Sequence, residues 1–510
     1  MSDHPPESDE ARRVEVRPDG IWAPSLYQVG LAVLLGGIFA ASMSPYLNTD
    51  LWWHLRVGEM IVTEGRVPDR DTLSFTATGQ PWLVHEWLAE VIFYLMHRSF
   101  GIPGLLVLVS SVVTLTFLLL HIRMLRRGAS PILSLALMIP AWIAAMYSFF
   151  LRIQPITLLL LAAFLLLLEE FQRTHRRRLL IAMPVLMLVW ANLHGGFAVG
   201  LVVILIYLVG EVLESLREDA PAMPRRDLLA LALCLVASMI ASLGTPGGFA
   251  NLAYPFRFIT PNFFTDHINE SQRPAFADPI AIAFEILLLG LLAAAFLRRE
   301  RVRWPDILVV VSFAHLGLSQ LRHLSVFSVA AAPLLAHFGS DVLGDRFRGS
   351  DALMRRPSGR LLPVFHWVVL LGSFLLLGTI AQPYLTNETL RFIERRDYPS
   401  AASEFLVRGD FGTKVFAEYR WGGYVLWKLN PTFQTFIDGR ADTVFSEENF
   451  AAYLDIYSLA PGWEQKLDRS GTDIVLLEPE SRLASALTES AFWRPVYRDE
   501  VAVAFVRRGS

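Results

Sequence analysis

The sequence predicts a polytopic α-helical membrane protein with about eleven spans and a small C-terminal α/β domain. Hydrophobic residues make up 53% of the 510 residues and charged residues 18%, and the mean hydropathy is +0.42. Soluble domains carry about 25% charged residues, and the shortage here falls in long apolar runs. This pattern excludes a soluble multidomain enzyme, a disordered scaffold and a disulfide-stapled secreted module. The net charge of −3 gives no reason to expect a nucleic-acid partner.

The apolar runs have the composition of membrane-crossing helices, which need about 20 residues each. A polar tail of residues 1–24 precedes the first run, and no small-residue cleavage pattern follows it, so we expect an uncleaved span. The single cysteine, Cys234, lies within an apolar run, which excludes an internal disulfide. Short runs set the range at ten to twelve spans. The predicted spans are 26–47, 102–122, 131–150, 155–169, 180–193, 196–214, 228–244, 279–297, 305–320, 324–339 and 361–381.

Arginine placement predicts the orientation. The dense arginine clusters all fall in loops of the same parity, which indicates that these loops and the N-terminus are cytoplasmic. The clusters lie at 123–127, 173–178, 217–226, 298–303 and 346–360. An odd number of spans in the cytoplasmic (inner) membrane then places the loop 47–101 and the C-terminal segment on the outer, periplasmic or extracellular, side. We therefore expect a transmembrane domain at 25–384 that includes this outer loop.

The segment 385–510 contains all three lysines, and its apolar runs shorten to strand length. These runs predict a small soluble α/β domain. The stretch from Asp438 to Asp442 is typical of a turn after a strand. We expect strands at 414–419, 434–438, 473–478, 493–497 and 501–507. We expect helices at 399–408, 447–457, 463–470 and 481–489.

Ionisable residues gather at the outer ends of the spans. Such residues are costly at membrane depth, so they mark a site unless their side chains snorkel to the interface. On the cytoplasmic side the charges are loop arginines, which we interpret as solvated. Several polar clusters on one face favour a shared cavity. They comprise Asp50, His54, Glu59, His85 and Glu86, then Arg152 and Gln154, then Asn192 and His194, then His267 and Glu270, and finally Arg322 and His323.

The first outer loop is the most specific feature of the sequence. A helical period from Asp50 to Glu64, with Gly65 as its stop, predicts an amphipathic helix along the membrane surface. Asp50, His54 and Gly58 are spaced four residues apart and share one face. The glycine on this face predicts room for a ligand. The alternative is that Asp50 only caps the start of the helix.

The string Asp50-Leu-Trp-Trp-His-Leu-Arg-Val-Gly-Glu59 resembles the first outer loop of the GT-C superfamily of membrane glycosyltransferases. It is most similar to the catalytic subunits of oligosaccharyltransferases and to bacterial relatives of these and of protein O-mannosyltransferases. His85-Glu86-Trp87, Trp190-Ala-Asn-Leu-His-Gly-Gly196 and Glu418-Tyr-Arg-Trp-Gly-Gly-Tyr424 look like further marks of such relatives. The Trp-Trp-Asp-Tyr-Gly acceptor-peptide motif of true oligosaccharyltransferases is absent. Asn48-Thr49-Asp50 stands where the superfamily has an Asp-x-Asp metal pair, so a divalent metal is neither required nor excluded.

The resemblance implies a polyprenyl-phosphate-linked sugar donor in the lipid bilayer and a glycan, lipid or protein acceptor. Such a donor leaves as a weakly basic anion and needs no general acid, so one base and phosphate-binding cations would suffice. We expect Asp50 to be the catalytic base and His54 to orient it or contact the sugar. Arg152, Arg322 and His323 are the candidates for the phosphate, with interfacial snorkelling of both arginines as the alternative. The candidate substrate-binding residues are Glu59, His85, Glu86, Arg152, Gln154, Asn192, His194, Arg322 and His323.

Two other functions compete with this hypothesis. One is a transporter or flippase for a lipid-linked sugar, which would favour internal repeats and charges near mid-bilayer. The other is a non-enzymatic membrane anchor whose outer domain docks a partner. The sequence has no internal repeat, and its ionisable residues lie at one face, which favours chemistry at the membrane surface.

Overall fold

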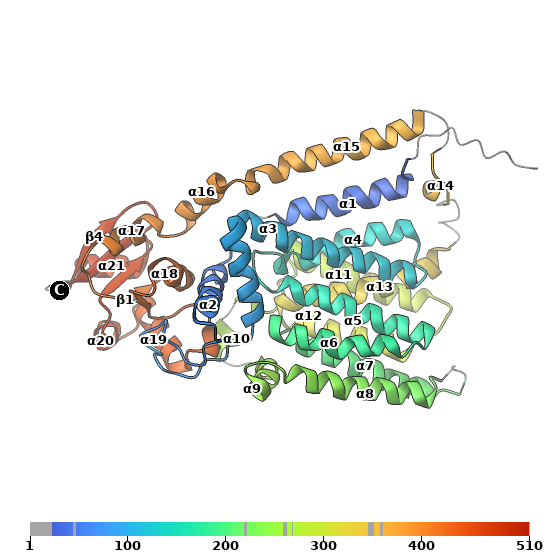
Figure 1. Cartoon of the computed structure of the whole chain (residues 1–510), viewed down its shortest axis with the longest axis horizontal. Coiled ribbons are helices and arrows are strands. Elements are labelled where there is room, and N and C mark those ends of the chain that lie inside the picture. Colours follow the sequence, from blue (N-terminus) through green and yellow to red (C-terminus); the bar gives the residue numbers. More distant parts are fainter. Residues whose placement is uncertain are drawn as a thin grey trace, which may run out of the picture.

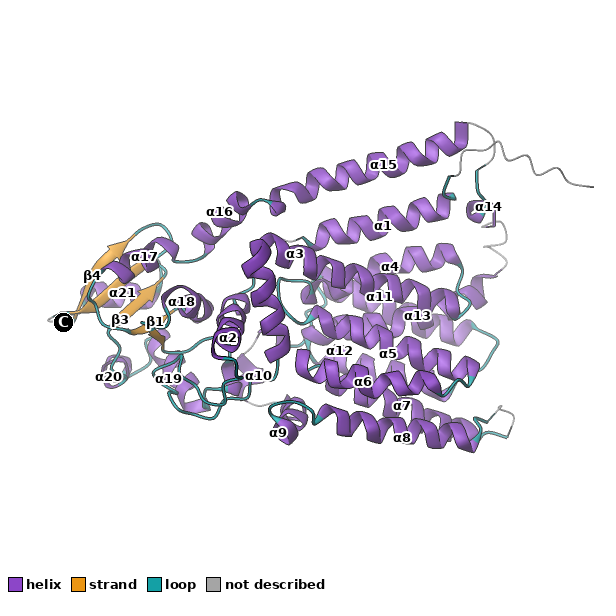
Figure 2. Cartoon of the chain, in the orientation of Figure 1, coloured by secondary structure: helices purple, strands orange, loops and turns teal. Residues whose placement is uncertain are grey.

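A helical bundle forms one end of the molecule and a five-stranded sheet with flanking helices forms the other (Figures 1 and 2). The computed structural model describes residues 23–43, 47–218, 222–258, 263–267, 269–344, 351–357 and 361–508. Most of the expected cytoplasmic tail, 1–24, therefore lies outside the described residues. Between the bundle and the sheet lie α2, α10 and the beginning of α3 (Figure 1).

Each of the predicted spans is a helix in the structure. Seven helical segments in the described part of the chain are long and apolar enough to cross a membrane, and α1, α6 and α12 are shorter apolar helices. The helices of the bundle are α1 (Leu26–Ser42), α3 (Trp87–Arg126), α4 (Pro131–Ala145) followed by η1 (Met146–Ser148), α5 (Pro155–Thr174), α6 (Arg178–Leu193), α7 (Phe197–Ser215), α8 (Arg225–Ser242), α11 (Pro279–Leu297), α12 (Trp304–Ser319), η4 (Leu321–His323) with α13 (Leu324–Leu343), and α15 (Leu361–Ala381) with η6 (Gln382–Leu385).

The outer surface of the bundle is apolar. Phe296 on α11 is 87% exposed, and Leu361 and Leu375 on α15 are 85% and 74% exposed. Contact of so much apolar surface with water would be unfavourable by about 25 cal/mol per Å², so this surface fits a lipid environment. A helix suits that environment, because it satisfies its own backbone hydrogen bonds. The chain is therefore a multi-pass membrane protein.

At the end of the bundle that is expected to face the cytoplasm, the prediction that the arginines are solvated is wrong for two of them, Arg123 and Arg127. Arg123 is fully buried and donates to Glu169 through two nitrogens, at 2.6 and 3.1 Å, and to the Val329 carbonyl at 2.6 Å. Arg127 pairs with Glu169 and Asp306, each at 3.0 Å. The convergence of α3, α5, α12 and α13 at this end brings the acids to the arginines, which apolar periodicity does not reveal.

The first outer loop folds as predicted at its helix. The helix α2 (Asp50–Glu64) ends at Gly65, whose φ of 68° confirms the expected stop. It packs on the first part of α3, which breaks at Gly101 (φ 66°) before the membrane portion begins. A Cβ at Gly58 would lie 2.1 Å from the Glu90 carbonyl oxygen. The expected room for a ligand at Gly58 is therefore wrong, because α3 occupies it.

The C-terminal segment has the predicted α/β character. Its sheet order is β2-β1-β3-β5-β4, with β2, β1 and β3 parallel and β5 antiparallel to both β3 and β4. The register pairs Val415 with Ile474 and Val475 with Phe505. The strands are β1 (Lys414–Ala417), β2 (Gln434–Thr435), β3 (Ile474–Leu477), β4 (Trp493–Arg498) and β5 (Val503–Arg507). The helices are α16 (Asn387–Asp397), α17 (Ser400–Arg408), η7 (Tyr419–Trp421), α18 (Gly422–Leu429), η8 (Ala441–Thr443), α19 (Glu447–Tyr457), α20 (Trp463–Arg469) and α21 (Arg482–Glu489).

Two of the α-helices, α16 and α18, and the short 3₁₀ helix η7 are not predicted by the sequence. The paired glycines that begin α18 are typical of a turn, but Gly422 is needed because a Cβ there would lie 2.3 Å from the Ile437 carbonyl oxygen. α18 packs on α2, and residues 57–84 share an apolar core with the sheet domain through Leu73, Trp82 and Phe436. The remaining short helices lie in loops of the bundle, four of them between α8 and α11 and one, α14, between α13 and α15. They are α9 (Gly248–Ala253), η2 (Tyr254–Phe258), α10 (Phe263–His267), η3 (Asn269–Ser271) and α14 (Asp351–Met354).

Candidate active site

Asp50 is the first residue of α2 and faces side chains rather than capping the helix. The preceding residue, Thr49, is the N-cap and makes no side-chain capping bond. One Asp50 oxygen accepts from Arg152 Nη2 at 2.9 Å, and the other accepts from Trp53 Nε1 at 3.3 Å. Burial raises the pKa of Asp50 above its ordinary value, although Arg152 opposes the shift. The carboxylate is thus held in place by two donors and kept more basic than an exposed aspartate.

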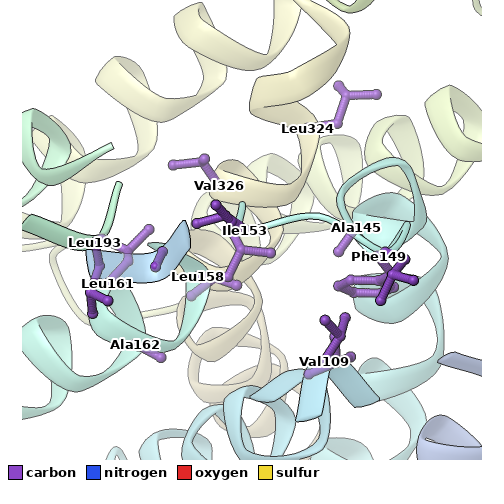
Figure 3. Close-up of a cluster of buried hydrophobic side chains, with 14 of the residues drawn as sticks. Val109, Ala145, Phe149, Ile153, Leu158, Leu161, Ala162, Leu193, Leu324 and Val326 are labelled. Carbon is purple, nitrogen blue, oxygen red and sulfur yellow. The ribbon is translucent and has the colours of Figure 1, made fainter. Parts of the chain in front are cut away.

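Arg152 reaches Asp50 because its neighbours anchor the connection between η1 and α5. Phe149, Leu151 and Ile153 are buried in the apolar cluster of the bundle, where Figure 3 shows Phe149 and Ile153. Arg152 stands in the sequence between two of these anchored residues. The second terminal nitrogen of Arg152 donates to Glu270 at 2.6 Å. Its side chain is 14% exposed and binds two carboxylates. This geometry favours a site role over interfacial snorkelling.

The ion pairs of the triad formed by Asp50, Arg152 and Glu270 shift the pKa values of its members. Burial alone would lower the pKa of Arg152, but Glu270 and Asp50 outweigh it and the pKa is raised. Burial likewise would raise the pKa of Glu270, but Arg152 and then Arg322 lower it. The pairing therefore favours the charged forms of Glu270 and Arg152, and Arg322 lies close enough to act on Glu270.

A second group gathers around Glu86. Its oxygens lie 3.5 Å from His85 Nε2, 3.3 Å from His194 Nε2 and 3.7 Å from His54 Nε2. Burial would raise the pKa of Glu86, but the histidines, His85 first, lower it strongly. Conversely, Glu86 raises the pKa of His85 against the effect of burial. The Glu86 carboxylate is therefore ionised. Within the described residues it is the only carboxylate that lies within 4 Å of three histidine side chains.

His54 and His194 are held in neutral forms. Burial lowers the pKa of His54 to about 3, although Glu86 opposes it, and its Nδ1 lies 3.3 Å from Glu90. Burial also lowers the pKa of His194. The Gly196 N–H donates to His194 Nδ1 at 2.8 Å, so Nε2 carries the proton that faces Glu86. The ring of His54 packs 3.6 Å from that of Trp53, which links this group to Asp50.

The other predicted residues take different places. Arg322 donates from Nε to Gln320 at 2.8 Å beside the triad. His323 Nδ1 and Gln154 Oε1 are buried without a hydrogen-bond partner in the described structure. Asn192 accepts from Trp87 Nε1 at 2.6 Å and so fixes the start of α3 against α6. Glu59 pairs with Arg56 at 2.7 Å, and no contact in the described structure brings it to the Asp50 or Glu86 groups.

The C-terminal domain reaches the candidate base directly. A Cβ at Gly439 would lie 2.5 Å from Asp50 Oδ1 and 2.8 Å from Trp53 Nε1. The turn around Gly439 is fixed by Arg440, which is fully buried and pairs with Asp71 at 2.6 Å and Asp438 at 2.8 Å. The turn predicted at 438–442 is present at Gly439 and Arg440 and continues into η8, but its contact with Asp50 is not predicted by the sequence.

Sequence reasoning also missed other members of the site. Tyr254 donates to Asp442 at 3.1 Å, and its ring lies 4.7 Å from that of His85. Glu90 follows Glu86 by one helical turn, a spacing that could have placed it beside His54. Glu270 is among the ionisable residues predicted at the outer ends of the spans, but it is not a predicted site residue, and only its salt bridge with Arg152 shows that it belongs to the site. Tyr254 and Gly439 carry no such signal, because they reach the site only through tertiary packing.

The resemblance raises a divalent metal as a cofactor, and the residues around Asp50 do not suit one. Asn48 stands at the first position of the Asp-x-Asp pair and accepts from the Asp50 N–H at 2.8 Å. Arg152 already supplies the positive charge between the carboxylates of Asp50 and Glu270. Among the described residues, no group of three or more His, Cys, Asp and Glu side chains could hold a metal ion.

The fold is similar to those of two solved membrane glycosyltransferases. The oligosaccharyltransferase of Archaeoglobus fulgidus in its apo form matches with a TM-score of 0.55 and 10% sequence identity, over 94% of this chain and 74% of that chain. The mycobacterial arabinofuranosyltransferase AftD matches with a TM-score of 0.53 and 14% identity, over 96% of this chain and 42% of that chain. No protein-family model matches the sequence, and no curated protein matches it significantly.

These likenesses define the class of fold. The chain has a GT-C-like fold, an α-helical membrane bundle followed by a small sheet-containing domain, as the sequence predicted.

Proposed function

We propose that the protein is a membrane glycosyltransferase that moves a sugar or glycan from a polyprenyl-phosphate donor to an acceptor, with Asp50 as the catalytic base. The observation that carries this proposal is the position of Asp50. Its carboxylate lies where the bundle, the first outer loop and Gly439 of the C-terminal domain meet, and Arg152 and Trp53 hold it. The GT-C-like fold supports glycosyl transfer as the reaction class. The arginine clusters in alternate loops support placing this end outside the cytoplasmic membrane.

The proposed step needs one proton acceptor. An acceptor hydroxyl loses its proton to an Asp50 oxygen while its own oxygen forms a bond to the anomeric carbon of the donor. The bond between that carbon and the phosphate oxygen breaks, and its electron pair leaves with the lipid phosphate. The raised pKa of Asp50 suits this role, because a more basic carboxylate takes a proton more readily.

Cations and sugar-binding groups complete the proposal. Arg152 and Arg322 would stabilise the charge that develops on the departing phosphate, with His323 and the buried Gln154 beside them. Glu86 with His54, His85 and His194 would bind sugar hydroxyls, because a carboxylate and imidazole groups can each hydrogen-bond a hydroxyl. Asn192 would hold the start of α3 behind this group, and Glu59 would contribute only from the far side of α2.

Turnover of lipid-linked donors in proteoliposomes tests the proposal. A panel of polyprenyl-phosphate sugars is offered to the wild type and to Asp50→Asn, which keeps the size of the side chain and removes the basic carboxylate. We expect turnover to fall by at least ~10²-fold, the usual range for loss of a general base. Asp69→Asn, at an exposed acid of the same loop, is the matched control and should keep normal turnover. A fully active Asp50→Asn protein would contradict the proposal.

A further inference from the structure

A groove on the C-terminal domain, lined by none of the residues of the Asp50 group, carries an unbalanced positive charge. It is formed by α16, α17 and α18 and has a volume of about 440 Å³. We call it the juxtamembrane groove. Its charged lining consists of four cationic and two anionic side chains, which leaves two positive charges in excess. The cationic residues are Arg391, Arg395, Arg408 and Lys428, and the anionic residues are Glu394 and Glu404.

The cations of the groove differ in their pairing. Lys428 pairs with Glu394 at 2.7 Å, and the same carboxylate accepts from Tyr424 at 2.7 Å. In the part of the chain that the structure describes, the arginines at 391, 395 and 408 make no ion pair or hydrogen bond. By contrast, the cavity at the opposite end of the bundle is lined by arginines, Arg126 and Arg127 among them, that already hold Glu169, Glu170 and Asp306. The juxtamembrane groove thus has guanidinium groups available for an anion.

The groove lies at the membrane boundary. α16 begins two residues after η6, which ends the lipid-facing helix α15 (Figure 1). Gly101 lies where the membrane portion of α3 begins, and a Cβ there would lie 3.2 Å from Asn387 Oδ1 at the start of α16. Leu385, just before α16, and Phe392, within α16, are 49% and 64% exposed, and Val407 in the wall of the groove is 58% exposed. Apolar side chains next to arginines at this depth match a phosphate group attached to acyl chains.

We propose that the juxtamembrane groove binds the phosphate headgroup of an anionic phospholipid. The arginines match phosphate oxygens through paired N–H donors, and the exposed apolar side chains contact the first part of the acyl chains. Tyr424, in the wall of the groove, packs edge-on against Trp52 of α2 with ring centroids 5.0 Å apart. The bound lipid therefore holds α18 against the helix that carries Asp50. This proposal does not depend on the reaction proposed above.

Lipid retention by the whole protein tests this binding. The protein is placed in nanodiscs of phosphatidylcholine alone or of phosphatidylcholine mixed with phosphatidylglycerol. Bound lipid is then measured by native mass spectrometry and stability by thermal unfolding. We expect the wild type to retain phosphatidylglycerol preferentially and to unfold at a higher temperature in its presence. In Arg391→Gln/Arg395→Gln/Arg408→Gln, the affinity for phosphatidylglycerol should fall by about tenfold or more.

Three comparisons make the result specific. The matched control Arg469→Gln/Arg482→Gln/Arg494→Gln removes the same charge from exposed arginines of the same domain that do not line the groove, and it should retain phosphatidylglycerol like the wild type. The corresponding triple lysine variant of the groove should keep part of the preference, because it keeps the charge. Inorganic phosphate should not raise the unfolding temperature in phosphatidylcholine. Equal lipid loss in both glutamine variants, no loss in the groove variant, or full stabilisation by inorganic phosphate would overturn the proposal.

Discussion

Arg152 binds two carboxylates through two different nitrogens, so its replacement by lysine separates charge from geometry. Nη1 donates to Glu270 at 2.6 Å and Nη2 donates to Asp50 at 2.9 Å. Lysine keeps the positive charge but has one nitrogen in place of this fork. Loss of one charge-assisted hydrogen bond costs about 1.5–3 kcal/mol, which corresponds to a rate loss of about ten- to 150-fold. We expect Arg152→Lys to show this loss mainly in kcat for donor turnover in proteoliposomes.

Arg152→Gln adds a second readout, because it removes the charge as well. Arg152 lowers the pKa of Asp50 against the effect of burial, so its loss should raise that pKa further. A base works only when deprotonated, and the acidic limb of the pH–rate profile should therefore move to higher pH in Arg152→Gln and stay in place in Arg152→Lys. Arg126→Lys, at a half-exposed arginine paired with Glu170 at the other end of the bundle, is the control. Normal rates and an unmoved limb in both Arg152 variants would refute the reasoning.

Four further outcomes follow from the same site. Gly439→Ala should lower turnover by about ten- to a hundredfold, because its Cβ would lie 2.5 Å from Asp50 Oδ1. Gly37→Ala, with open space around the added Cβ, should leave turnover unchanged. A fully active Gly439→Ala protein would contradict a role of the C-terminal domain in the site. The acidic limb of the wild type should lie above the ordinary aspartate pKa of about 3.9, because burial raises the pKa of Asp50. His54→Gln should leave that limb in place, because His54, with a pKa of about 3, is already neutral there; a limb that disappears in His54→Gln would assign it to the histidine. Chelation of divalent ions with EDTA should not change turnover, because Arg152 already pairs with both Asp50 and Glu270. Activity lost to EDTA and restored by Mg²⁺ or Mn²⁺ would contradict this.

The sequence by itself determined the features that depend on local patterns. Apolar runs and turn residues predicted the helices of the bundle and the strands of the C-terminal domain, because burial in lipid or in a sheet imposes a hydropathy that a window of residues reveals. The same reasoning predicted α2 and its stop at Gly65. It also singled out Asp50, His54, His85, Glu86, Arg152 and His194, because charged groups at the ends of apolar helices are costly unless they have a partner.

Only the tertiary structure decided which of these residues meet. Arg152 is 102 residues from Asp50 and 118 residues from Glu270 in sequence, and no local period records that pairing. Gly58 belongs to a close helix contact, and Glu59 turns to Arg56, although both lie on the helix that the sequence marked. Gly439 reaches Asp50 from a different part of the chain. Such contacts are fixed by how α2, α3 and the sheet domain pack, because a side chain's partner depends on the crossing of whole elements and not on its neighbours in sequence.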